Sequence, residues 1–124
     1  MSDFALELNA ITVTFRSKDD PDQRYTAVGD TTLRVRAGEF VSVVGPTGCG
    51  KSTLLNIGAG LLEASSGEVK VFGEVLQGIN RRAGYMFQTE ALMPWRSAID
   101  NVLVGLQYRG MPDTEARQHA QDWL

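Results

Sequence analysis

The stretch that decides the fold reads V-G-P-T-G-C-G-K-S-T and occupies residues 44–53 of a chain of 124 residues. It holds three glycines, one lysine and three hydroxyl-bearing residues. An almost continuous apolar run, F-V-S-V-V at residues 40–44, comes before it, and two leucines, Leu54 and Leu55, follow it. A buried strand, a glycine-rich turn and a helix in this order predict a loop that binds an anion.

The spacing of this loop matches G-x-x-x-x-G-K-[ST], the phosphate-binding pattern. Glycine is needed where the backbone wraps an anion closely, and the helix that follows presents its N–H groups and its dipole. The lysine reaches the outer phosphates of a nucleotide, and the hydroxyl beside it is a ligand for Mg²⁺. The residues predicted to bind the nucleotide are Gly45, Pro46, Thr47, Gly48, Cys49, Gly50, Lys51, Ser52 and Thr53.

The composition is that of a globular protein with one domain, expected over residues 1–124. Hydrophobic residues make up 43% and charged residues 22%, and the net charge is −3. This negative charge argues against binding nucleic acid through bulk charge. A single cysteine, Cys49, excludes an internal disulfide. The amino terminus lacks the pattern of a signal peptide, and no apolar run approaches the ~20 residues that cross a membrane.

Periodicity predicts alternating strands and helices. Ser97 and Asp100 form an S-x-x-D helix-start pattern, and Gly110 and Pro112 end that helix. Asp113 or Thr114 is expected to cap the helix after it. Strands are predicted at residues 4–15, 31–36, 40–44, 68–73 and 83–88, and helices at 52–62, from about 97, and from about 113.

Several further motifs stand in a fixed order around the loop. Residues 38–56 closely resemble the Walker A region of ABC transporter ATPases, and S-G-E-V at 66–69 and G-Y-M-F-Q at 84–88 resemble the turn and the Q-loop that follow it in that family. L-M-P-W-R at 92–96 is most similar to importers of nitrate, sulfonates and taurine. The resemblance implies an α/β fold: the amino-terminal part of a P-loop nucleotide-binding domain, with an antiparallel β layer and the start of a helical subdomain.

The resemblance also implies roles for individual residues. Phe15 stands where the family places an aromatic ring against adenine, with Tyr25 as a weaker rival. Gln88 is expected to bind Mg²⁺ and to sense the γ-phosphate, so that Lys51 and Gln88 form the catalytic set. The segment from Leu92 to Ser97 is expected to contact a membrane permease.

For the complete protein, the resemblance implies binding and hydrolysis of Mg-ATP. It also implies a second nucleotide-binding subunit in a dimer, indirect work with a solute-binding protein, no nucleic acid partner, and a place on the cytoplasmic face of the membrane.

Some family motifs do not occur among these residues. The signature motif, the Walker B strand with its glutamate and the switch histidine are missing, so this chain alone is expected to lack a water-activating group. Gly58 stands where the family usually has a large aliphatic residue. Two alternatives stay open: a truncated remnant that binds nucleotide without hydrolysing it, and another soluble P-loop NTPase or kinase. Phosphate release discriminates the first, and capture of a permease the second.

Overall fold

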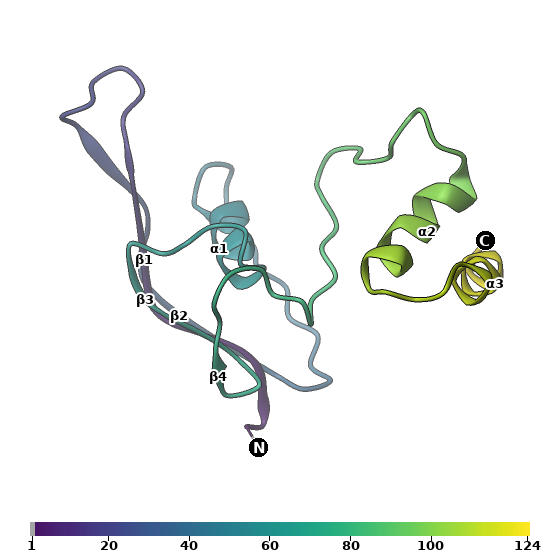
Figure 1. The fold of residues 1–124 in the computed structure, drawn as a ribbon. Coiled ribbons are helices and arrows are strands. Elements are labelled where there is room, and N and C mark those ends of the chain that lie inside the picture. Colours follow the sequence, from purple (N-terminus) through teal and green to yellow (C-terminus); the bar gives the residue numbers. More distant parts are fainter. Residues whose placement is uncertain (1) are drawn as a thin grey trace. The chain divides into compact units, whose positions relative to one another are not determined.

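The computed structural model describes residues 2–124, and these form two compact units. The first unit extends to Tyr85 and the second begins at Met86. The first unit contains the glycine-rich loop, and the second contains two helices (Figure 1).

The first unit is built on a four-stranded antiparallel sheet. Its strands are β1 (Phe4–Arg16), β2 (Arg24–Arg36), β3 (Ser66–Val71) and β4 (Glu74–Val75), in the order β2-β1-β3-β4. The central strand β1 pairs with both β2 and β3. The predicted antiparallel layer is thus confirmed, although the sequence pattern identified only the second half of β2.

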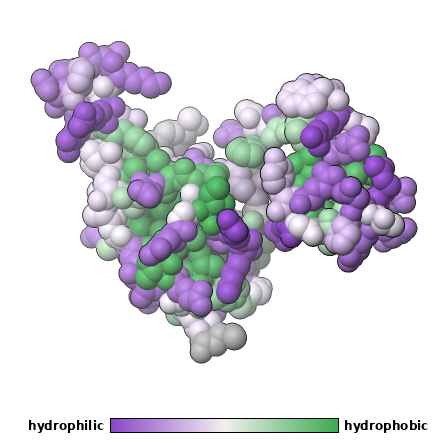
Figure 2. All heavy atoms as spheres, viewed as in Figure 1, coloured by the Kyte–Doolittle hydropathy of each residue, from purple (hydrophilic) through white to green (hydrophobic). Residues whose placement is uncertain are grey.

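The core of the first unit lies between this sheet and the helix α1 (Lys51–Gly58). Register shifts interrupt β1 between Leu8 and Ile11, and such a bulge lets two residues three positions apart face the same core. Figure 2 shows apolar side chains gathered over this unit between hydrophilic ones. The buried side chains of this core are Leu8, Ile11, Val13, Val28, Leu54 and Ile57.

Helix α1 is shorter than the predicted helix at 52–62. It ends at Gly58, and Gly60 adopts a left-handed conformation with φ of 72°. A helix commonly ends where a glycine takes up this conformation, because other residues are strained there. Gly58 therefore lies at the helix end, and its backbone packs against Leu6.

The strands predicted at 40–44 and 83–88 are wrong for the described residues, because neither segment pairs with another strand there. Phe40 and Val44 are 93% and 87% exposed. An apolar run becomes a strand only when neighbouring backbones satisfy its N–H and C=O groups, and local pattern cannot supply that neighbour.

The second unit packs α2 (Ala98–Tyr108) against α3 (Asp113–Trp123). The predicted cap of α2 is confirmed, since the Ser97 hydroxyl accepts a hydrogen bond from the Asp100 N–H at 3.2 Å. The predicted cap of α3 is wrong: Pro112 holds the N-cap position, and Asp113 already belongs to the first turn. The buried core of this unit consists of Leu103, Ala116 and Ala120.

Within residues 2–124, none of the helices combines the length and the apolar character needed to span a membrane.

Candidate functional site

The glycine-rich loop is closed around the ammonium group of its own lysine. Lys51 is the first residue of α1, and its Nζ donates hydrogen bonds to the carbonyl oxygens of Gly45 at 2.5 Å and Pro46 at 2.8 Å. The same nitrogen lies 3.7 Å from the Cys49 sulfur. The loop therefore curves so that a positive charge is held at its centre.

The amino-terminal end of α1 adds backbone donors to this charge. Its N-cap residue is Gly50, and no side chain caps the helix. The first helical hydrogen bond runs from the Leu54 N–H to the Gly50 carbonyl at 2.9 Å, so the N–H groups of Lys51, Ser52 and Thr53 have no acceptor within the helix. A helix end of this kind attracts anions through its dipole and its N–H groups.

Two glycines make the loop possible. Gly50 has φ of 94°, and a Cβ placed on it would lie 2.5 Å from the carbonyl oxygen of Ala27 on β2. A Cβ on Gly45 would lie 2.7 Å from the Cys49 sulfur. The predicted glycines thus allow close approach of the loop to β2 and to itself, and the cradle fits an anionic group such as a phosphate.

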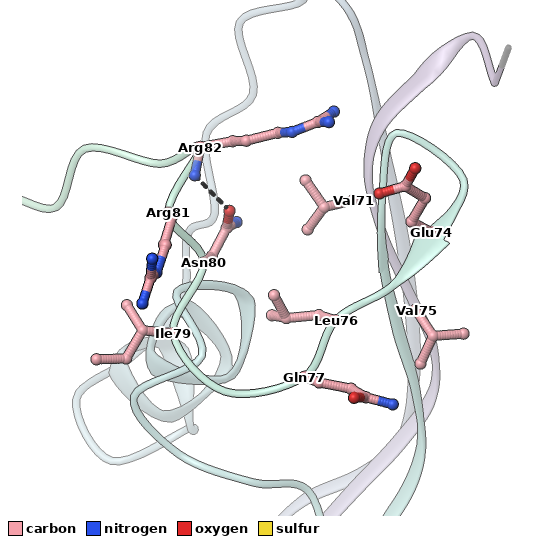
Figure 3. Close-up of a pocket in the computed structure, with 9 residues that line it drawn as sticks. All are labelled: Val71, Glu74, Val75, Leu76, Gln77, Ile79, Asn80, Arg81 and Arg82. Carbon is pink, nitrogen blue, oxygen red and sulfur yellow. Dashed lines mark hydrogen bonds between the residues drawn. The ribbon is translucent and has the colours of Figure 1, made fainter. Parts of the chain in front are cut away.

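The other end of α1 is fastened by Asn80, a residue that the sequence analysis missed. Asn80 is buried; its Nδ2 donates to the Gly58 carbonyl at 3.1 Å and its backbone N–H to the Ala59 carbonyl at 2.9 Å. Its Oδ1 accepts a hydrogen bond from the Arg82 N–H at 3.1 Å (Figure 3). No periodic pattern marks this asparagine in the sequence; its burial and its hydrogen bonds in the structure reveal the role.

A hollow of about 330 Å³ lies beside Asn80. Figure 3 shows its two arginines, Arg81 and Arg82, pointing in different directions rather than converging on one point. This arrangement does not form a shared anion site. The hollow is lined by Val71, Glu74, Val75, Leu76, Gln77, Ile79, Asn80, Arg81 and Arg82.

Two aromatic residues proposed for base binding contact each other in the first unit. The rings of Phe15 and Tyr25 have centroids 5.7 Å apart and are inclined by 39°. The structure therefore brings both candidates together on the β1–β2 hairpin.

The second unit contains the remaining predicted residues. Gln88 is exposed and lies outside any helix or strand. Leu92 and Trp95 are 76% and 78% exposed, and Met93 is half-buried. The segment from Leu92 to Ser97 therefore presents large apolar side chains to its surroundings, as expected of a contact surface.

Asn101, whose role the sequence analysis also missed, holds this segment. Its Oδ1 accepts a hydrogen bond from the Met93 N–H at 2.9 Å. Its Nδ2 contacts three carbonyl oxygens, those of Met93 and Arg96 at 3.2 Å and that of Ser97 at 2.9 Å. One amide on the first turns of α2 thus fixes the backbone of the exposed segment. The signal in the sequence was its place four residues after the capping Ser97, one helical turn along α2.

A comparison with models of protein families identifies the class of protein to which the chain belongs. Residues 28–124 match the family model described as ABC transporter, and the chain belongs to this family. The resemblance inferred from the motifs is confirmed.

Two of the curated proteins that are similar to this chain are named as taurine import ATP-binding proteins. The chain is 41% identical over 119 residues to TauB of Pseudomonas aeruginosa, covering 96% of this chain and 44% of that protein. It is 43% identical over 100 residues to TauB of Chromobacterium violaceum, covering 81% of this chain and 38% of that protein. The chain thus spans less than half the length of these curated relatives.

Solved structures of ATP-binding cassettes share the fold. One is the dimeric, post-hydrolysis state of the cassette MJ0796 bound to ADP and phosphate, with a TM-score of 0.81 and 29% identity over 94% of this chain and 54% of that one. Another dimeric structure of the same cassette gives a TM-score of 0.82. The predicted fold class, a partial P-loop domain of the ABC type, is confirmed.

Proposed function

We propose that this chain binds Mg-ATP through residues 45–53 as part of the ATPase subunit of an ABC importer. The observation that carries the proposal is the Lys51 ammonium, held inside a glycine loop at the uncapped end of α1. Lys51 would neutralise the outer phosphates, and the N–H groups after Gly50 would bind phosphate oxygens. Ser52 would hold Mg²⁺ through its hydroxyl, and the metal would supply further positive charge.

Hydrolysis in the complete protein is the second part of the proposal. Phosphoryl transfer depends on positioned charge and on an oriented water molecule. Lys51 supplies charge, and Gln88 would bind Mg²⁺ and sense the γ-phosphate. No group of the Lys51, Ser52 and Gln88 set activates water. We therefore expect these 124 residues alone to bind nucleotide without hydrolysing it.

Transport is the third part. The relatives named for taurine import support a small anionic solute, such as taurine, a sulfonate or nitrate. The exposed segment from Leu92 to Ser97 would contact the membrane permease, which would keep the subunit at the cytoplasmic face and couple it indirectly to a solute-binding protein. The dimeric cassette of similar fold supports a second nucleotide-binding subunit as partner.

The first test replaces the lysine of the loop. Lys51→Ala should weaken Mg-ATP binding at least about tenfold, because a charge-assisted hydrogen bond to phosphate is lost. Lys70→Ala is the matched control, since Lys70 lies on β3 and pairs with Glu68 at 3.1 Å. Equal Mg-ATP affinity for Lys51→Ala and wild type, by calorimetry, would reject the proposed nucleotide site.

A second test addresses the permease. Trp95→Ala should reduce co-purification of the permease with the protein at its natural length, because a large exposed side chain leaves the contact surface. Mg-ATP affinity should stay unchanged. Undiminished capture by this variant would argue against a contact through this segment.

A further inference from the structure

One hydrogen bond joins α1 to the last residue of the first unit. The Tyr85 hydroxyl donates to the side-chain carbonyl oxygen of Asn56, Oδ1, at 2.5 Å, across 29 positions of the chain. Asn56 lies in α1, and Tyr85 is the residue before Met86, where the second unit begins. The bond therefore fastens the helix that follows the glycine-rich loop to the point at which the chain leaves the first unit.

The segment that leads to Tyr85 follows α1 from its carboxyl-terminal end. The side chain and the backbone N–H of Asn80 donate hydrogen bonds to the carbonyl oxygens of Gly58 and Ala59. Tyr85 then contacts Asn56, which is two to three residues nearer the amino-terminal end of the helix. This step is about 3–4.5 Å along the helix axis. The segment therefore runs back along α1 toward the end where the glycine-rich loop lies.

Neither partner of this hydrogen bond belongs to the residues proposed to bind phosphate. Asn56 follows Lys51 by five residues, which is about 7.5 Å along a helix. Tyr85 is 38% exposed and Asn56 is partly buried, and other side chains form the buried apolar core of the unit. Because the bond lies neither at the phosphate loop nor inside the core, its loss should leave nucleotide binding and the fold intact.

Gln88 follows Tyr85 by three residues. Three residues of fully extended chain span at most about 11 Å, so a contact that holds Tyr85 also limits where Gln88 can lie. Gln88 belongs to no helix or strand of the described residues, so the backbone hydrogen bonds of a regular element do not fix its position. The position of Gln88 therefore depends on the points at which the chain beside it is held.

We infer that Tyr85 is a positioning residue for hydrolysis and that it acts through Gln88. Its hydroxyl ties the chain to α1, the helix that begins with Lys51 and Ser52, so that the chain reaches Gln88 from a fixed point. This inference rests on the proposed function, in which Gln88 binds Mg²⁺ and senses the γ-phosphate. A group that must act with sub-ångström precision loses rate when its support loosens, even while the nucleotide stays bound.

The test separates the rate of hydrolysis from the affinity for nucleotide. The protein is expressed at its natural length; kcat is measured by phosphate release, and the Kd of a non-hydrolysable ATP analogue with Mg²⁺ by calorimetry. Tyr85→Phe removes only the hydroxyl and should lower kcat about 3- to 10-fold, which corresponds to the loss of one neutral hydrogen bond, with Kd changed less than about twofold. Tyr108→Phe, at a tyrosine of α2 that is 90% exposed, is the control and should change neither quantity.

Variants of Asn56 test the other partner of the bond. Asn56→Ala removes the acceptor and should lower kcat as Tyr85→Phe does. The double variant should be no slower than either single variant, because both substitutions remove the same bond. Asn56→Asp keeps an oxygen that accepts the hydrogen bond and should retain the wild-type kcat within about twofold. Thermal melting verifies that each variant is folded.

A variant of Gln88 tests whether Tyr85 acts through it. Gln88→Ala should lower kcat, and the addition of Tyr85→Phe should then lower it less than about twofold further, because the tie no longer positions the glutamine. A merely structural role of Tyr85 would instead give the same fractional loss of kcat with and without Gln88.

The outcomes distinguish the inference from the proposed function. If wild type hydrolyses ATP and Tyr85→Phe is equally fast, the inference is overturned and the proposed function stands. The same fractional loss in the Gln88→Ala background, or parallel losses of kcat and of affinity for the analogue, would also overturn it. If wild type at its natural length does not bind the analogue, or binds it and does not hydrolyse ATP, the proposed function itself fails, and the inference with it.

Discussion

The irregular segment before α1, in the first unit, and the one before α2, in the second, are held in different ways. The loop before α1 is shaped by backbone: glycines that accept close contacts, and a lysine that hydrogen-bonds to the loop's own carbonyl oxygens. The segment before α2 is held by one side chain, the amide of Asn101, which contacts three of its residues. The first has a core of six buried side chains behind it, and the second a core of three.

This difference follows from what each segment offers to a ligand. A phosphate is bound by N–H groups that must approach within hydrogen-bond distance, so side chains are kept away and glycine geometry dominates. In the proposed contact with the permease, the partner would be bound by side chains such as Leu92 and Trp95, and the amide of Asn101 holds the backbone that carries them.

The largest expected effect tests the glycine geometry. Gly50→Ala should lower the free energy of unfolding by about 4 kcal/mol, because its φ of 94° is strained for alanine and its Cβ would overlap the Ala27 carbonyl. The control is Gly48→Ala, where φ is 83° but nothing lies within 4 Å of the added Cβ, and the expected loss is about 1–2 kcal/mol. Urea denaturation measures both. Equal losses would mean that contact with β2 does not shape the loop.

The next effect tests the role of the amide in the second unit. Asn101→Ala should lower the free energy of unfolding by about 2–3 kcal/mol, because it leaves several backbone groups of the 93–97 segment without their hydrogen-bond partner. The Met93 amide should then exchange its hydrogen faster. Gln107→Ala on the same helix, which loses one contact of 3.4 Å to Asp113, should change stability by less than about 0.5 kcal/mol. Unaltered exchange at Met93 in Asn101→Ala would contradict the assignment.

The smallest effect is kinetic and concerns the loop alone. Cys49 is the one cysteine of the 124-residue sequence, and it is exposed. Mg-ATP should slow its alkylation by a maleimide several-fold, because bound phosphates would cover the loop. Mg²⁺ without nucleotide is the control and should leave the rate unchanged. Alkylation at the same rate with saturating Mg-ATP would place the nucleotide away from Cys49.

Much of the candidate site could be predicted because its chemistry is local. The spacing of Gly45, Gly50 and Lys51 specifies the loop within a few residues, and the Ser97 cap forms within one turn of α2. The predictions that were wrong concern strands, whose pairing is not a local property. The apolar run at 40–44 has the composition of a strand, but pairing depends on residues far along a chain.

The sequence by itself determined the position of the glycine-rich loop, the helices that begin at Lys51 and Ala98, and the family, because each depends on residues close together in the chain. Only the tertiary structure decided that Asn80 fastens the end of α1 and that a register shift in β1 lets Leu8 and Ile11 face the same core. The physical reason is that these contacts join segments tens of residues apart, or depend on a one-residue shift in pairing that local periodicity does not record.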